Sequence, residues 1–298
     1  MKNLLSTITL FLIPFLAYMQ VSVDANEVIA KLNKGEAAIY ENVTINGDID
    51  FRLIDDKEKN SNFELISKDN DTYKYHVNAP LKFTNCTFNG KFIAYFNEDI
   101  KKELHIAMFH ENVEFENCTF KNDFLVKYSE FDKNASFPGN TFEEGALFKY
   151  VKFSSEIDFS NSIFEEEANF KYAKFPMTTD FSKSKFREEA NFKYSEFEDK
   201  TNFINCEFFG TAIFKYTDFD DFVDISGSKF QSDAIFKYTK FPDGVNFENA
   251  YFDDFADFKY AEFYNPTNLK NVTFDSETSF KYTKIEGKSF VTYLLKNN

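Results

Sequence analysis

The sequence predicts an all-β solenoid, and three periodic features support that prediction. Phenylalanine occupies every eleventh position in sixteen successive units, from Phe109 to Phe274. Five positions before each of these lies a second, mostly apolar residue, in a series that begins at Leu104. One structural repeat consists of two such units, which we number so that Phe170 is position 1 and Phe175 is position 6. The triplet Phe-Lys-Tyr marks this longer period, starting at residues 148, 170, 192, 214, 236, 258 and 280.

Two other repeat architectures do not fit this spacing. An 11-residue repeat can form a right-handed coiled coil, but at about 100° per residue positions 1 and 6 lie about 140° apart around a helix, so no single apolar seam forms. A leucine-rich repeat requires apolar residues two and three positions apart. A solenoid of short strands fits, because strand alternation sends position 6 and the residue two positions before it to the same, inner side.

Small residues at position 4 complete the predicted interior. This position holds Ala, Ser, Thr, Val or Cys in nearly every unit, and Asn140 is the exception. Large rings beside small side chains fill a narrow interior without voids. Cys86, Cys118 and Cys206 all occupy this position, so we expect them to be buried packing residues. Cys118 and Cys206 are four coils apart, about 19 Å at strand spacing, which is too far for a disulfide.

The five-residue segments resemble those of the pentapeptide-repeat family. "ANFKY" and "AKFPM" follow one another from residue 168, and "TDFSK" and "SKFRE" do so from residue 179. The resemblance implies a right-handed quadrilateral β-helix, in which square coils stack into a rod. It covers residues 81–287 densely and recurs once at residues 40–51. Alternate units hold six residues in place of five, so the coil is longer than the commonest coil of the family, and we expect wider corners.

The chain before the dense repeats divides into two predicted segments. Residues 1–25 have the features of an export signal, with Lys2, an apolar run and the small Ala25 before a cleavage site. The alternative is an uncleaved membrane anchor, because the apolar run is nearly long enough to span a bilayer. Residues 26–80 are expected to form an N-terminal cap, a first coil and a hairpin-like excursion of two strands. A second irregularity, residues 97–103, is predicted to be a loop or a helical turn.

The last residues, 288–298, are predicted to cap the rod with a short helix. The Phe repeat ends at Phe280, after which Phe290, Tyr293 and Leu294 follow at helical spacing. A solenoid leaves its last coil with an open apolar face and an unpaired edge. We therefore expect a short amphipathic helix over this end, stabilised by the last coil or by a second molecule.

Outward-facing residues at positions 2 and 3 of alternate units form the candidate binding surface. Position 3 is always Tyr in these units and position 2 is Lys, and both are expected to stack at about 4.8 Å per coil in a stripe about 34 Å long. One interpretation is a docking strip for sugar rings or an acidic partner, flat enough for self-association as well. The other is a purely structural ladder that recurs because the repeats were duplicated. The candidate residues are Tyr128, Tyr150, Tyr172, Tyr194, Tyr216, Tyr238, Tyr260, Tyr282, Lys149, Lys171, Lys193, Lys215, Lys237 and Lys259.

Composition and motifs argue against several classes of function. The chain has 34 Lys and Arg against 49 Asp and Glu, a formal net charge of −15, which disfavours nucleic-acid binding. The sequence has no nucleophile elbow, no phosphate loop and no pair of carboxylates that stands out as catalytic. His76, His105 and His110 lack the spacing typical of metal ligands. We therefore expect no enzymatic activity, no cofactor and no bound metal.

The sequence thus favours an exported, non-enzymatic scaffold or binding module, located at the cell surface, in the periplasm or outside the cell. Its expected partner is a protein or an envelope glycan, and it contacts a membrane only if residues 1–25 are not removed. The C-terminal end and the Tyr face are also expected to be surfaces through which a homodimer can form. The alternative function is an inhibitor that binds a basic protein surface, since some members of the resembling family mimic DNA and occupy type II topoisomerases. An export signal and a Lys column on one face argue against that alternative.

Overall fold

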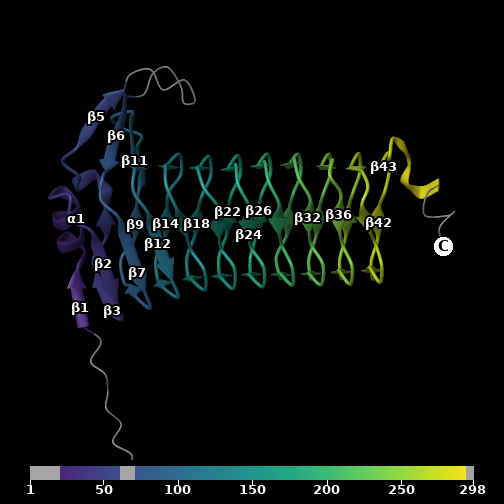
Figure 1. Ribbon diagram of the computed structural model, residues 1–298, viewed down its shortest axis with the longest axis horizontal. Helices are drawn as coiled ribbons and strands as arrows, with labels where there is room; N and C mark the ends of the chain where they lie inside the picture. Colours follow the sequence, from purple (N-terminus) through teal and green to yellow (C-terminus); the bar gives the residue numbers. More distant parts are fainter. Residues whose placement is uncertain (1–20, 61–70, 293–298) are drawn as a thin grey trace, which may run out of the picture.

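The chain forms a rod of stacked coils, described by a computed structural model over residues 21–60 and 71–292 (Figure 1). Each coil contributes one short strand to each of four sheets, and equivalent strands of successive coils pair in parallel. In most coils a strand is only two residues long, with one side chain buried and the other turned outward. The predicted all-β solenoid, similar to a quadrilateral β-helix, is confirmed.

Two of the sheets receive the position 6 phenylalanines of alternate units. In spatial order, sheet A consists of β1 (Val21–Asp24), β3 (Val43–Asn46), β8 (Thr87–Phe88), β13 (Thr119–Phe120), β17 (Thr141–Phe142), β21 (Ile163–Phe164), β25 (Lys185–Phe186), β29 (Glu207–Phe208), β33 (Lys229–Phe230), β37 (Tyr251–Phe252) and β41 (Thr273–Phe274). Sheet D consists of β5 (Lys57–Asn60), β6 (Asp71–Val77), β11 (Glu103–Phe109), β15 (Glu130–Phe131), β19 (Lys152–Phe153), β23 (Lys174–Phe175), β27 (Glu196–Phe197), β31 (Asp218–Phe219), β35 (Lys240–Phe241), β39 (Glu262–Phe263), β43 (Lys284–Ile285) and β44 (Lys288–Ser289), with β10 (Tyr95–Glu98) paired to β11.

The other two sheets present mostly smaller residues to the interior, with exceptions that include the buried rings of Phe92 and Phe124 in sheet C. Sheet B consists of β2 (Ala38–Glu41), β7 (Leu81–Thr84), β12 (Val113–Glu116), β16 (Ala135–Ser136), β20 (Ile157–Asp158), β24 (Thr179–Asp180), β28 (Thr201–Asn202), β32 (Val223–Asp224), β36 (Val245–Asn246) and β40 (Thr267–Asn268). Sheet C consists of β4 (Ile49–Asp50), β9 (Phe92–Ile93), β14 (Phe124–Leu125), β18 (Ala146–Leu147), β22 (Ala168–Asn169), β26 (Ala190–Asn191), β30 (Ala212–Ile213), β34 (Ala234–Ile235), β38 (Ala256–Asp257) and β42 (Thr278–Ser279).

Stacked phenylalanine rings fill the interior along the whole rod. Within sheet A, Phe164 and Phe186 stack with centroids 4.9 Å apart, and Phe208 continues the same file at 4.9 Å. Rings of neighbouring files meet edge to face, as Phe170 and Phe181 do at 5.3 Å and 82°. Both arrangements are favourable for aromatic rings, and all five rings are fully buried. The interior is therefore one continuous apolar core.

Each unit turns a corner between positions 1 and 4. The backbone N–H of Ala173 donates to the carbonyl of Phe170 at 2.9 Å, and that of Ser184 donates to Phe181 at 3.0 Å. The position 4 side chain is also a donor, since Ser184 Oγ donates to the carbonyl of Phe159 at 2.7 Å and Cys206 Sγ donates to that of Phe181 at 2.9 Å. Cys86, Cys118 and Cys206 are buried and free, as expected for packing residues.

A helix covers the N-terminal end of the rod. Helix α1 (Ala25–Asn33) buries Ala25, Val28, Ile29 and Leu32 against the first coil. The carboxylate of Asp24 accepts a hydrogen bond from the backbone N–H of Asn26 at 2.8 Å and so caps this helix. Of the predicted export signal, residues 1–20 lie outside the described residues, whereas β1 and Ala25 are part of the folded rod. In the described part of the chain no helix is both long and apolar enough to cross a membrane.

Four strands near the N-terminus extend sheet D into a flap, which is composed of β5, β6, β10 and β11. After β4 and the 3-10 helix η1 (Phe51–Leu53), β5 and β6 pair antiparallel, in the segment where two strands were expected. Strand β6 then pairs in parallel with β11 along its whole length, and β10 pairs antiparallel with β11. The loop predicted for residues 97–103 is present but shorter, because residues 99–102 form the hairpin turn, whereas β10 continues to Glu98 and β11 begins at Glu103.

The C-terminal end is partly covered. Strand β44 folds back antiparallel onto β43, and the helical residues 290–292 follow. Phe290 is buried and stacks on Phe263 at 5.0 Å and against Phe280 at 4.9 Å. A cavity of about 400 Å³ remains open beside these rings, lined in part by Leu269, Val272 and Phe274. The rest of the predicted cap helix, residues 293–298, lies outside the described residues.

Candidate binding surface: the lysine–tyrosine stripe

The predicted Lys and Tyr residues come together in one file along the corner between sheets C and D. In each coil they follow a strand of sheet C and precede one of sheet D, as Lys171 and Tyr172 do between β22 and β23. We call this file the stripe, and it contains the eight tyrosines at 128, 150, 172, 194, 216, 238, 260 and 282 with the lysine before each of them.

The tyrosines of the stripe adopt a backbone conformation that tyrosine rarely takes. Each has a positive φ, between 57° and 64°. With the hydrogen bond between positions 1 and 4, this makes the corner a type II turn, whose third residue is usually Gly or Asn. The opposite corner mostly follows that rule, with Asn205, Gly227 and Asn249 at the equivalent position and Lys183 as an exception. A left-handed backbone costs a residue with a β-carbon about 1–2 kcal/mol, so tyrosine occurs at the stripe against the local preference of the turn.

Stacking of the rings offsets part of this cost. Tyr172 and Tyr194 stack with centroids 4.8 Å apart and planes 7° apart, and Tyr216 follows at 5.1 Å. All seven steps from Tyr128 to Tyr282 lie between 4.6 and 5.1 Å. Cross-strand aromatic pairs of this kind contribute roughly 0.2–1 kcal/mol each. Stacking between neighbouring coils therefore stabilises tyrosine at this position without any ligand.

The same stacking limits what the stripe can bind. The faces of the inner rings are covered by their neighbours, so a sugar ring cannot stack on them. Exposure increases toward the C-terminus, with Tyr260 37% exposed and Tyr282 57% exposed. At the other end, Tyr128 packs against Tyr95 of the flap at 5.9 Å and against a small apolar cluster of Leu104, Ile106 and Met108. Burial there raises the pKa of Tyr128 to about 12.

The lysines give the stripe a positive charge that the surrounding carboxylates do not neutralise. Each ammonium lies 4.8–5.4 Å from the centroid of the following Tyr ring, a cation–π distance. Among the described residues, none of the eight has an ion pair with a carboxylate, whereas lysines elsewhere on the rod do, as in Lys152–Glu130 and Lys174–Glu196. Burial, followed by repulsion from the neighbouring lysines, lowers the pKa of Lys171. The stripe is thus a positive file on a chain of net charge −15.

A groove runs beside the C-terminal half of the stripe. Its volume is about 670 Å³. One wall consists of the tyrosines from Tyr194 to Tyr282, and the other is the outward column of sheet D, which includes Asp218, Lys240 and Glu262. The groove is long and open, which suits an extended chain better than a compact small molecule.

Sequence reasoning missed the neighbourhood of the histidines. His76 lies 34 residues before His110 along the chain, yet the two are neighbours in the fold because β6 and β11 are neighbouring parallel strands. His76 Nδ1 and His110 Nε2 are 2.8 Å apart, and His110 Nδ1 is 2.6 Å from Asp132. In the described residues, the one group with ligand atoms close enough to hold a metal ion is Glu98, Glu103 and His105. Sequence spacing contained no signal for either cluster.

Comparison with known proteins agrees with the fold. A family model described as pentapeptide repeats (9 copies) matches residues 148–196 and residues 214–262. The chain is a pentapeptide-repeat protein, as its stacked coils and its five- and six-residue units indicate. No curated protein and no solved structure matches it significantly.

Proposed function

We propose that the protein is an exported, non-enzymatic binding module whose stripe holds an extended anionic glycan of the cell envelope. A pentapeptide-repeat β-solenoid supports a non-catalytic role, because the rod presents long regular surfaces and its core is filled by side chains. The observation that supports this ligand is the file of eight lysines, none of which forms an ion pair with a carboxylate of the described residues. The tyrosines that follow the lysines in the C-terminal half of the stripe form one wall of the open groove. Repeated ammonium groups attract repeated carboxylate or phosphate groups at matching intervals.

The geometry also suggests how such a chain lies on the protein. Since the inner ring faces are closed, the tyrosines offer their edges and hydroxyl groups, which suit hydrogen bonds to a polar chain. The ammonium groups recur at the coil spacing of about 4.8 Å. A flexible polymer adjusts its register along such a file, so we expect avidity from many weak contacts.

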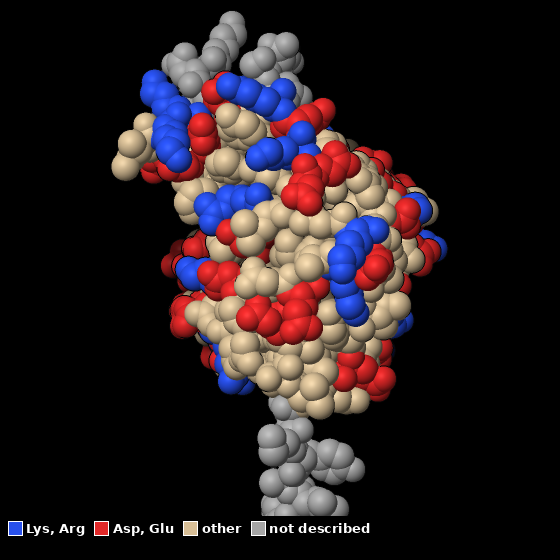
Figure 2. All heavy atoms as spheres, turned by 90° about the vertical axis from the view of Figure 1, so that its left-hand side faces the viewer, with Lys and Arg blue, Asp and Glu red and all other residues tan. Residues whose placement is uncertain are grey.

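Charge distribution favours this function over the inhibitor that imitates DNA. Figure 2 shows the N-terminal end of the rod, where Lys and Arg are interspersed with Asp and Glu. The lysine stripe adds a positive file along one corner of the rod. A surface that imitates the phosphates of a duplex needs negative charge in place of these features.

A matched pair of charge variants tests the glycan function. The test variant replaces Lys193, Lys215, Lys237 and Lys259 with Gln, and the control replaces Lys133, Lys185, Lys229 and Lys270, which lie outside the stripe. Both variants change the net charge equally. We expect the test variant to lose at least about fourfold in affinity for an anionic envelope polysaccharide, since four exposed ion pairs at about 0.2–1 kcal/mol each contribute about 0.8–4 kcal/mol, and the control to lose little. Equal retention of both variants on the polysaccharide contradicts the proposal.

Export is tested separately, by fractionation of cells and N-terminal sequencing of the mature chain. A cleavage after Ala25 removes β1, which pairs with β3, and removes Asp24, which caps α1. The mature protein should therefore be less stable if it begins at Asn26 than if it begins upstream of Val21. Recovery of the protein only from the cytoplasm, with an intact N-terminus, contradicts export.

A further inference from the structure

The turn of the β10–β11 hairpin is closed by two residues of the same charge. Glu98 and Glu103 are direct partners across the antiparallel pair, a position where like charges are destabilising. The next strand continues the row, because Asp71 of β6 lies directly opposite Glu103 on its other side. Three carboxylates therefore lie side by side on three neighbouring strands.

Among the described residues, lysines form ion pairs with two of these three carboxylates. Lys59 lies 2.7 Å from Asp71, and Lys101, in the turn, lies 2.9 Å from Glu98. Arg52 is engaged by Asp50 at 2.6 Å. In the described part of the chain, Glu103 has no Lys or Arg partner, and its nearest basic group is His105 Nε2 at 3.7 Å.

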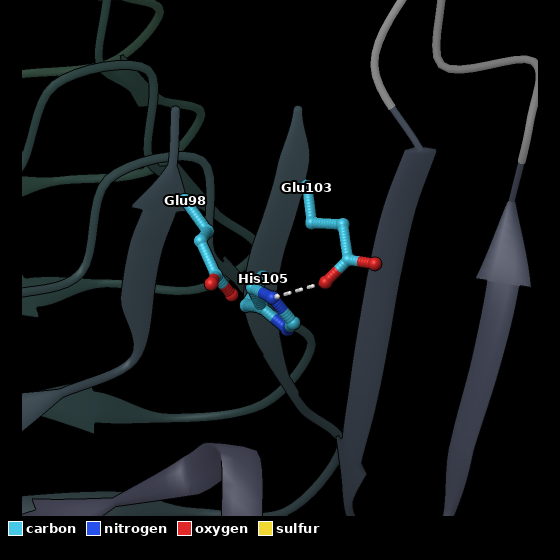
Figure 3. Close-up of side chains that lie close together, drawn as sticks. All are labelled: Glu98, Glu103 and His105. Carbon is cyan, nitrogen blue, oxygen red and sulfur yellow. Dashed lines mark ion pairs between the residues drawn. The ribbon is translucent and has the colours of Figure 1, made fainter. Parts of the chain in front are cut away.

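His105 lies between the two glutamates with one ring nitrogen unused. Its Nδ1 is 2.8 Å from the hydroxyl of Tyr75. Its Nε2 is buried and has no hydrogen-bond partner among the described residues. A buried polar atom without a partner costs free energy, and Figure 3 shows the ring between the side chains of Glu98 and Glu103.

We propose that Glu98, Glu103 and His105 form a site for a divalent transition-metal ion of the Zn²⁺ type, which fastens the β10–β11 hairpin. The three ligand atoms lie within 4.8 Å of one another. Ligands about 2.0–2.2 Å from one Zn²⁺ lie about 3–4 Å apart, so small rotations of the two glutamate side chains complete the site. The ion neutralises the opposed carboxylates and gives Nε2 a partner, while Tyr75 orients the ring through Nδ1 in the manner of an outer-shell group.

The donor set also selects the kind of ion. An imidazole nitrogen with two carboxylates suits Zn²⁺ and its neighbours in the first transition row, whereas Ca²⁺ and Mg²⁺ prefer oxygen ligands alone. Glu98 is about one-third exposed, so water has access to the remaining coordination positions. With three protein ligands and open positions, the site is built to hold an ion with moderate affinity.

Calorimetric titration of the chelator-treated full chain with ZnCl2 tests the site. We expect one saturable equivalent above weak background binding, no displacement by excess CaCl2 or MgCl2, and a higher thermal midpoint with Zn²⁺. Glu103→Gln keeps the size of a half-buried side chain and should weaken the binding of this Zn²⁺ at least tenfold, and His105→Gln should do the same. X-ray absorption of the bound ion should show one imidazole nitrogen.

His110→Gln is the matched control, because His110 lies in the same flap but outside the cluster. This variant should still bind one saturable equivalent of Zn²⁺, which distinguishes the proposed site from one at His76 and His110. Circular dichroism establishes that each variant is folded. The proposal is overturned if the wild-type chain has no saturable equivalent, or if the equivalent survives both Glu103→Gln and His105→Gln.

Discussion

Replacing Phe197 with Ala should cost far more stability than replacing Tyr194 in the same coil. Phe197 is 1% exposed and stacks between Phe175 at 4.5 Å and Phe219 at 5.1 Å. It also meets Phe203 edge to face at 6.2 Å. Removal of the ring leaves a cavity in a core that cannot collapse, because the coils above and below hold its walls apart, and we expect a loss of about 3–5 kcal/mol.

For the substitution of Tyr194 with Asn, the loss of ring stacking and the relief of backbone strain nearly cancel in the free energy of unfolding. Its ring is half-buried and loses two stacking contacts, with Tyr172 and Tyr216, together about 0.4–2 kcal/mol. Substitution with Asn, which tolerates the left-handed backbone, recovers about 1 kcal/mol, so Tyr194→Asn should change the free energy of unfolding by less than about 1 kcal/mol. Tyr194→Ala keeps the backbone strain and should be the less stable of the two.

Equilibrium urea unfolding followed by circular dichroism measures these differences. The comparison is valid only where the urea dependence of the unfolding free energy is unchanged, because long repeat arrays can lose two-state behaviour. Equal losses for Phe197→Ala and Tyr194→Asn would refute the assignment of Phe to the interior and Tyr to the surface. A larger loss for Asn than for Ala at position 194 would refute the account of the turn.

Three further predictions concern the end of the rod, the thiols and alkaline pH. Truncation after Gly287 removes Phe290 from Phe263 and Phe280 and should raise aggregation in light scattering; a monodisperse truncated protein would show that the segment is dispensable. Cys86, Cys118 and Cys206 are buried, and burial raises the pKa of Cys206, so a thiol reagent should label Cys206 only as fast as the protein unfolds, and labelling of the native state at the rate of free cysteine would contradict this. The pKa of Tyr128 is raised to about 12 in the folded protein, against about 10 when unfolded; its neutral form therefore favours folding below pH 10, and this contribution is lost as the pH rises toward 12. The thermal midpoint should fall less over that interval in Tyr128→Phe, and an identical fall in both proteins would contradict the prediction.

The periodic part of the fold was predictable because each coil repeats one local arrangement. Positions such as Phe175 and Ser184 have the same surroundings in every repeat, so their spacing alone indicated the core. The left-handed turn at Tyr172 was not predicted, since tyrosine is not typical of it. The signal was present at the opposite corner of the coils, where Asn161 and Gly227 occupy the equivalent position.

The flap was less predictable for a physical reason. Strands β6 and β11 pair outside the repeat, although residues 78–102 separate them along the chain, so their contacts depend on where the intervening coil ends. The spacing of His76, His105 and His110 along the chain therefore says little about their distance in space. The small cluster of Leu104, Ile106 and Met108 on Tyr128 has the same origin.

The equal register of successive coils means that the length of the rod is set by its number of coils. Because each strand pairs with its equivalent in the next coil, an in-frame duplication of one coil, such as residues 190–211, adds about 4.8 Å to the rod and keeps the register of the strands and of the buried Phe rings. The length of the rod can therefore change by whole coils through duplication or deletion of the coding sequence. Deletion of half a coil keeps the Phe residues in register. It moves the tyrosines that follow to the other corner, where tyrosine then lies next to asparagine at the junction. Such a rod can therefore vary in its number of coils as well as in the residues of each coil.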